Sequence, residues 1–157
     1  MRRFVVLLVA LGCVAIAPPT QAAPTEWIVQ GRGCALNVPS FTQDCLRIGI
    51  STAAPIGGVA RFEPASGATV EVVVTCAAVV ESSDSSGPYR ALHASGPATS
   101  GQHYYFGVRE NLDGTGDRYS FSTTPAAPLP GVPCSAGFDD TRTVDIGGFG
   151  FGSHAGL

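Results

Sequence analysis

The chain contains no lysine, so its positive charge comes from nine arginines alone, set against twelve acidic residues. Seven arginines lie beyond residue 22, spaced singly along the sequence, which predicts no basic patch: Arg32, Arg47, Arg61, Arg90, Arg109, Arg118 and Arg142. Proteins that bind nucleic acid normally carry a clustered positive surface. The charge pattern therefore excludes nucleic acid as an expected partner.

Motifs of catalysis are also missing. The sequence has no G-x-S-x-G nucleophile elbow. Ser153 and His154 are adjacent, but a nucleophile and its base must meet in space on a rigid frame, and we expect His154 to lie in a mobile terminus. Asp139 and Asp140 are neighbours in a predicted turn, where their side chains point apart and cannot form a hydrolytic pair. The sequence thus predicts a protein that is not an enzyme and that has no cofactor.

Long apolar runs are absent beyond the first residues. Arg2 and Arg3 precede the uncharged residues 4–17, a run too short for a spanning helix of about 20 residues but typical of a secretory signal. Cleavage after Ala22 makes residues 1–22 a signal peptide and leaves residues 23–157 as one exported domain without a transmembrane segment. Lipid anchoring at Cys13 is the alternative, but the run continues past Cys13 and favours secretion.

Removal of residues 1–22 leaves an even number of cysteines: Cys34, Cys45, Cys76 and Cys134. Disulfides are the default in an oxidising compartment. A zinc site is not expected, because the sequence contains no C-x-x-C motif. Three pairings are possible. We favour Cys34–Cys45 with Cys76–Cys134, because the ten residues between the first two close a compact local loop.

Helical periodicity is almost absent, and 20 glycines and 12 prolines interrupt any long helical window. Strand patterns recur instead, at residues 27–29, 46–51, 59–63, 69–80, 89–95, 102–110, 118–124 and 141–151. Residues 69–80 are the strongest, predicted as one central strand with Val70, Val72, Val74, Cys76, Ala78 and Val80 on one face. About eight short strands predict a single all-β antiparallel sandwich or small barrel, held by disulfides.

Local detail follows from the same patterns. Residues 82–88 are predicted as a polar loop, and residues 124–133, with four prolines, as a crossing that leads to Cys134. The segments 102–110 and 118–124 form a predicted hairpin whose inward side chains are Tyr104, Phe106, Val108, Tyr119 and Phe121. In the last strand, Phe149 and Phe151 share a face, and the glycines on the other face permit close approach of a neighbouring backbone.

Three patterns together carry a family resemblance: Gly58-Val59-Ala60-Arg61-Phe62, Val74-Thr75-Cys76, and the stretch from Phe106 to Phe121 with Glu110-Asn111 and Asp113-Gly114-Thr115-Gly116-Asp117. Their order over residues 46–124 resembles a broad group of exported bacterial all-β proteins of unassigned function. The resemblance implies a small extracytoplasmic sandwich or barrel in which Cys134 pairs with Cys76. Glu110 stands where the group has Asp, and the group offers no substrate.

The segment from Glu110 to Asp117 concentrates side-chain oxygens around glycines. Calcium prefers such ligands, so Asn111, Asp113 and Asp117 are the candidates for a metal site. The twelfth position counted from Asn111 is Ser122, not the bidentate acid of an EF-hand loop. We therefore favour a turn in which these side chains bond nearby backbone N–H groups.

Two further sites are open to test. A five-residue turn after residue 95 would set His93 and His103 opposite each other on adjacent strands, the beginning of a transition-metal site. The Cys34–Cys45 loop could present Phe41 as an exposed anchor, as in a protease inhibitor, an interpretation that requires Phe41 to be exposed.

The expected function is therefore that of a secreted, non-enzymatic protein with a binding or structural role toward an extracellular protein or the cell surface. A calcium- or metal-dependent extracellular enzyme is the first alternative, favoured if the acidic loop and the two histidines meet in one pocket. A protein resembling a protease inhibitor, with a disulfide-held loop, is the second.

Overall fold

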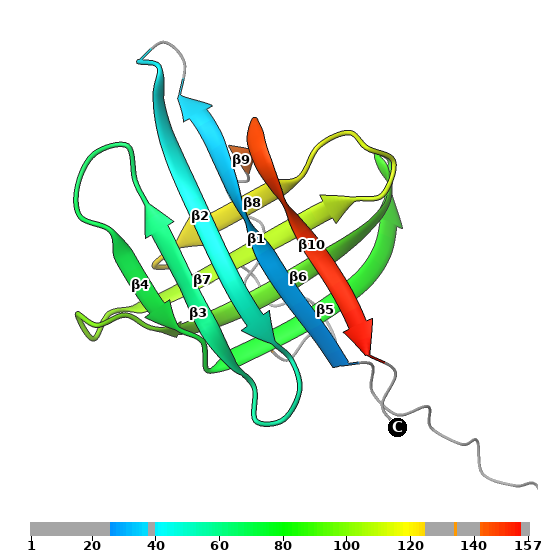
Figure 1. Cartoon of the computed structure of the whole chain (residues 1–157), viewed down its shortest axis with the longest axis horizontal. Helices are drawn as coiled ribbons and strands as arrows, with labels where there is room; N and C mark the ends of the chain where they lie inside the picture. Colours follow the sequence, from blue (N-terminus) through cyan, green and yellow to red (C-terminus); the bar gives the residue numbers. More distant parts are fainter. Residues whose placement is uncertain (1–25, 38–39, 125–133, 135–141, 155–157) are drawn as a thin grey trace, which may run out of the picture.

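The computed structural model describes residues 26–37, 40–124, 134 and 142–154, which form two antiparallel five-stranded sheets (Figure 1). The first sheet has the order β10-β1-β2-β3-β4 and the second the order β5-β6-β7-β8-β9. The strands are β1 (Glu26–Asn37), β2 (Thr42–Ser51), β3 (Gly57–Glu63), β4 (Val70–Val73), β5 (Cys76–Asp84), β6 (Gly87–Pro97), β7 (His103–Asn111), β8 (Arg118–Ser122), β9 (Arg142–Thr143) and β10 (Ile146–His154). The predicted all-β antiparallel sandwich is confirmed.

Several predictions concern other parts of the chain. The signal peptide at residues 1–22, Cys13, the proline-rich crossing at 125–133 and the pair Asp139–Asp140 lie outside the described residues. Among the residues that are described, no helix is long and apolar enough to cross a membrane.

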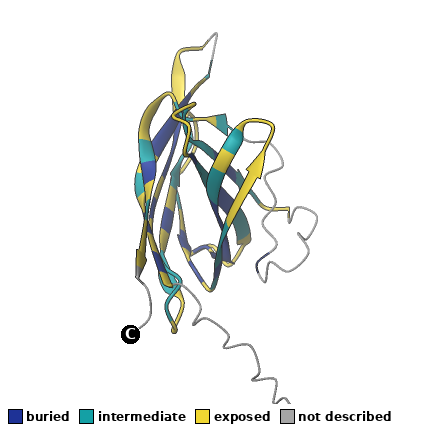
Figure 2. Ribbon diagram, turned by 90° about the vertical axis from the view of Figure 1, so that its right-hand side faces the viewer, coloured by how far each residue is buried: buried dark blue, intermediate teal, exposed yellow. Residues whose placement is uncertain are grey.

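The two sheets are stacked face to face, and their strands cross steeply (Figure 1). Steep crossing is the arrangement of orthogonally packed sheets, in which strands pass from one layer to the other at the corners. Figure 2 shows the buried residues facing one another between the layers. Neighbouring strands joined by short turns account for most of each sheet, as hairpin connections require.

The core consists of alternate residues from both sheets. Its most deeply buried apolar members are Val29, Leu46, Ala60, Val72, Leu92, Ala94, Phe106, Val108 and Tyr119. The inward face predicted for the β7–β8 hairpin is confirmed: Phe106, Val108 and Tyr119 are buried, and Tyr104 and Phe121 are half-buried against them. Burial of each large apolar side chain contributes about 1.5–3 kcal/mol, which makes this face a main source of stability.

The prediction of one central strand at residues 69–80 is wrong. The segment divides into β4 and β5, which are edge strands of different sheets. The change of sheet is visible in two consecutive amides: Val74 N donates to Gly58 O in the first sheet at 3.0 Å, and Thr75 N donates to Ser95 O in the second at 3.0 Å. The inward face changes parity there, because Val72 and Val74 are followed by Ala77. Cys76 therefore does not share their face.

Two other boundaries also differ from the prediction. β5 continues to Asp84 and pairs with Gly87, so the predicted loop at 82–88 is a tight hairpin in which Ser86 N donates to Asp84 Oδ1 at 2.8 Å. The last predicted strand is divided between β9 in the second sheet and β10 in the first. His154 is the last residue of β10 and pairs with Glu26.

Gly96 allows the two sheets to meet at one corner. It lies at the end of β6, where Val72 of β4 forms an isolated bridge with Ala98. A Cβ at position 96 would overlap the carbonyl of Val73 and crowd the Cα of Val74. Only glycine therefore fits where these two backbones approach.

We predict that Gly96→Ala lowers the free energy of unfolding by about 1–3 kcal/mol, because the added methyl group forces the corner apart. Gly49→Ala is the matched control, since a Cβ there meets no atom within 4 Å. Urea denaturation of both variants measures the difference. Equal stability of the two variants would contradict this account of the corner.

Candidate functional site

The β1–β2 hairpin is closed at its base by a disulfide between directly paired residues. Cys34 and Cys45 face each other in the β1–β2 register, with their Cα atoms 4.0 Å apart. Both cysteines are buried, although they lie on the outer face of the first sheet. The second disulfide joins Cys76 to Cys134. Both predicted pairings are confirmed.

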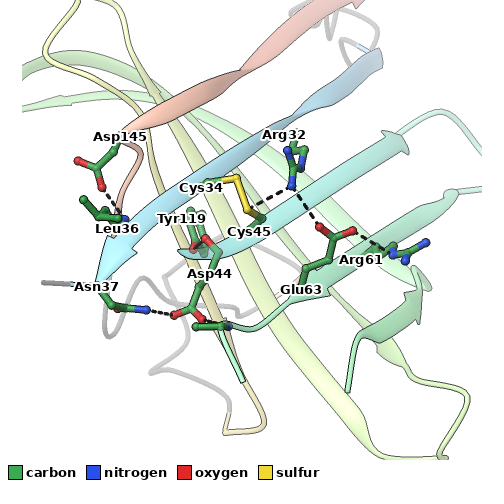
Figure 3. The surroundings of a disulfide bond; sticks show 11 residues. Arg32, Cys34, Leu36, Asn37, Asp44, Cys45, Arg61, Glu63, Tyr119 and Asp145 are labelled. Atoms are coloured by element: carbon green, nitrogen blue, oxygen red, sulfur yellow. Dashed lines mark hydrogen bonds and ion pairs between the residues drawn. A yellow bond between two sulfur atoms is a disulfide. The ribbon is translucent and has the colours of Figure 1, made fainter. Parts of the chain in front are cut away.

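An arginine covers the first disulfide. Arg32 Nη2 lies 3.4 Å from Cys45 Sγ and 3.2 Å from Glu63 Oε2, and Arg61 Nε lies 3.2 Å from the other oxygen of Glu63 (Figure 3). Glu63 is the cross-strand partner of Cys45. The disulfide is thus flanked by charged side chains of β1 and β3, the two strands on either side of β2.

Asp44, next to Cys45, joins the hairpin to the rest of the molecule. Its carboxylate accepts hydrogen bonds from Asn37 Nδ2 at 3.1 Å (Figure 3) and from Ala65 N at 2.6 Å. It also forms an ion pair with Arg142. Its backbone carbonyl accepts a hydrogen bond from the buried Tyr119 hydroxyl at 2.7 Å. A buried carboxylate is retained at low cost only when it is paired and hydrogen-bonded in this way.

The environment of Asp44 favours its ionised form. Burial by itself raises the pKa of the carboxyl group. The hydrogen bonds from Ala65 and Asn37 and the charge of Arg142 together lower the pKa by more than burial raises it. The pKa of Asp44 consequently lies below the ordinary value for aspartate. Burial raises the pKa of Tyr119, so its hydroxyl stays protonated as a donor to Asp44.

Beyond this base, the hairpin projects past the end of the sandwich, as Figures 1 and 2 both show. Phe41 near its tip is 78% exposed and has a φ of 53°, in the left-handed region that few bulky residues adopt. Ser40 Oγ donates to Asn37 O at 3.1 Å and bonds Thr42 Oγ1 at 2.9 Å. Leu36 N donates to Asp145 Oδ2 at 2.7 Å, which connects the hairpin to the segment before β10. Phe41 is therefore exposed, as the interpretation of this loop as a protease-inhibitor-like anchor requires.

The three calcium candidates have local partners. Asn111 is buried, with Oδ1 accepting from Arg109 Nε and Nδ2 donating to Gly116 O, both at 2.6 Å. Asp113 Oδ1 accepts from the amide and hydroxyl of Thr115. Asp117 Oδ2 accepts from Phe149 N at 2.7 Å. In the described part of the chain, no three residues among His, Cys, Asp and Glu lie close enough to hold a metal ion.

The predicted pairing of His93 with His103 is wrong. β6 extends to Pro97, so His93 pairs with Gly107 and His103 pairs with Pro97. His93 is buried, whereas His103 is exposed beside the ring of Tyr105 at a centroid distance of 5.0 Å. Ser153 and His154 are consecutive residues at the end of β10, and they pair with Trp27 and Glu26 of β1.

An arrangement missed by the sequence analysis is a row of arginines. Arg32 pairs with Arg47, and Arg47 with Arg61, so three arginines lie side by side across β1, β2 and β3. The expectation of no basic patch is therefore wrong for this face. One signal could have revealed it: Arg32 precedes Cys34 by two residues and Arg47 follows Cys45 by two, so pairing the cysteines also pairs the arginines.

A scan against protein-family models matched none, and searches of curated proteins and of solved structures returned no similar protein. The function is therefore argued from the geometry of the hairpin and of the adjoining sheet face.

We predict that Asp44→Asn lowers the free energy of unfolding by about 2–3 kcal/mol at pH 7, because it removes the charge that pairs with Arg142 and weakens buried hydrogen bonds. The folded-state pKa of Asp44 lies below its unfolded value of about 3.9, so the stabilisation is present above about pH 4 and is lost as pH falls through the folded pKa. The gap between wild type and variant should shrink below pH 4 in urea denaturation. Glu71→Gln, which changes an exposed residue, is the control. The role of Asp44 would be contradicted if Glu71→Gln lowered the free energy of unfolding as much as Asp44→Asn does, or if the difference between wild type and Asp44→Asn did not change with pH.

Proposed function

We propose that this chain is an exported, non-catalytic binding protein that docks to a protein partner through the tip of its β1–β2 hairpin, with Phe41 as the anchor. The observation that carries the proposal is the 78% exposure of Phe41 on a hairpin whose base is fixed by a disulfide and a buried carboxylate. The partner fits if it offers an apolar pocket at the bottom of a cleft.

Export is supported by two disulfides and by the N-terminal sequence. Structural disulfides persist in oxidising compartments and are rare in the cytosol. Residues 1–22 have the charge, apolar run and small residues of a secretory signal. Both features favour a protein that works outside the cytoplasm.

An exposed aromatic ring on a hairpin that a disulfide holds suits protein recognition. Moving a Phe side chain from water into an apolar pocket contributes about 1.5–3 kcal/mol, and aromatic residues are common binding hot spots. The disulfide, Asp44 and Asp145 hold the hairpin before any partner arrives, so docking loses little conformational entropy. The geometry favours insertion of a stiff loop into a cleft.

The chemistry near the tip supports binding more than catalysis. Ser40, Thr42 and Gln43 surround Phe41 with polar uncharged side chains. The hydroxyl groups of Ser40 and Thr42 bond to each other, and no titratable base stands beside them among the described residues of the hairpin except Asp44, whose carboxylate is fully paired. A protease-inhibitor-like action is one form that such docking takes.

We predict that Phe41→Ser weakens binding to the partner by tenfold or more and leaves the melting temperature within about 2 °C of wild type, because an exposed side chain contributes little to folding. Leu112→Ser is the matched control, since Leu112 is 47% exposed in the turn after β7. The partner is found by photo-crosslinking in the medium of producing cells, with p-benzoylphenylalanine placed at position 41 or position 112.

The expected result is one discrete crosslinked adduct from position 41 and none from position 112. Excess unlabelled wild-type protein or Leu112→Ser should prevent formation of the adduct, whereas excess Phe41→Ser should not. Equal adducts from both positions, or competition by Phe41→Ser as strong as by wild type, would disprove docking through the tip. Binding of the protein to vesicles of neutral phospholipid that depends on Phe41 would assign the tip to membranes instead and would also overturn the proposal.

A further inference from the structure

The outer face of the first sheet holds like charges close together. Arg32, Arg47 and Arg61 are exposed, directly paired residues of three adjacent strands. Like charges directly opposite each other on neighbouring strands destabilise a sheet. The fold therefore keeps three guanidinium groups in one row against their mutual repulsion.

Glu63 compensates only the outer two. Arg32 and Arg61 each lie 3.2 Å from a different oxygen of this carboxylate. Arg47, in the middle of the row, makes no hydrogen bond or ion pair within the part of the chain that the structure describes. Arg47 is thus the guanidinium group of the row that can pair with an anion without first losing a partner.

A second observation on the same face is Gly49, two residues after Arg47 in the central strand β2. Glycine weakens a strand, and its presence there often marks the close approach of a ligand or of another backbone. No protein atom lies within 4 Å of the position that a Cβ would occupy at Gly49, so packing does not require glycine. The space above it is open to a ligand.

Two open hollows flank Arg47. One, of about 510 Å³, is lined by Gln30, Arg47, Gly49, Val59, Arg61 and Glu71 among others. The other, of about 650 Å³, lies between Gln30, Arg32, Arg47 and Gly150. A ligand that lies across the strands can therefore place an acidic group at Arg47 and neutral polar groups on either side.

We infer that this face binds a saccharide that carries carboxylate groups, with one carboxylate on Arg47 and a sugar ring over Gly49. The planar guanidinium matches a carboxylate through two parallel hydrogen bonds. Gln30 and Glu71 supply oxygens that accept hydrogen bonds from sugar hydroxyl groups. The face carries three arginines against Glu63 and Glu71, a local positive excess on a chain whose formal net charge is −3.

The same residues argue against nucleic acid. Proteins that bind single strands stack the bases on aromatic rings. No aromatic side chain lines either hollow. A uronic acid sugar, which presents one carboxylate and several hydroxyl groups on each ring, fits this combination of one free cation and neighbouring groups that accept hydrogen bonds.

The test uses oligomers of galacturonate and the same oligomers with methyl-esterified carboxylates. We expect the wild-type protein to bind the acid form and not the ester, with an affinity that falls as salt is added. Arg47→Gln should weaken binding by on the order of tenfold or more, the loss of a charge-assisted contact. Arg118→Gln, which removes the same charge from β8 in the other sheet, should leave binding unchanged.

Gly49→Val separates binding from folding. The valine fills open space on a strand and should keep the unfolding midpoint at or above that of wild type, while it blocks the hollow and abolishes binding. Absence of galacturonate binding by wild type, equal binding of acid and ester, or equal losses in Arg47→Gln and Arg118→Gln would overturn the inference. Poly-glutamate binding that displaces the sugar and depends on Arg47 would assign the face to acidic peptides and overturn the saccharide. None of these results bears on docking through Phe41, which lines neither hollow.

Discussion

The register between β1 and β2 decides where each candidate surface of this protein lies. Side chains alternate between the faces of a strand, so a slip of one residue would exchange inside and outside along the whole hairpin. The Cys34–Cys45 disulfide joins two directly paired residues and fixes that register covalently. On one side of it the pairing continues through Ala35 and Asp44 to the tip, and on the other it aligns Arg32 with Arg47. The hairpin tip and the arginine row follow from one bond.

Asp44 explains why the base of the hairpin is fixed while its tip is exposed. A carboxylate inside the sandwich is unfavourable unless its partners are in place, and here they come from the end of β1, the segment after β3, and β9. The Tyr119 hydroxyl adds a contact from β8 of the second sheet. Polar partners from distant segments thus meet where the hairpin leaves the core, and the apolar side chain of Phe41 stays outside. Such a division is expected where a rigid scaffold presents a binding residue.

Local patterns in the sequence predicted much of this fold. The even number of cysteines, the β7–β8 hairpin and its inward face of Phe106, Val108 and Tyr119 follow from spacing and alternation alone. The passage from β4 to β5 could not be predicted, because apolar alternation continues through Val74 and Thr75 while the hydrogen-bond partners change sheet. The prediction that His93 and His103 face each other was wrong, because the register of β6 and β7 depends on how far β6 continues before its turn. The arginine row needed the disulfide and the register together, since its members are distant in sequence.

The central claim is that the disulfide and Asp44 hold the hairpin rigid up to its exposed tip. Nitrogen-15 relaxation of the uniformly labelled, oxidised protein measures this directly through the backbone order parameters of Leu36, Asn37, Thr42 and Gln43. The account predicts order parameters of about 0.85, the value of rigid backbone, at all four amides. Values below about 0.6 at these amides, the range of flexible segments, would show that the hairpin moves independently of the sandwich and would contradict the account.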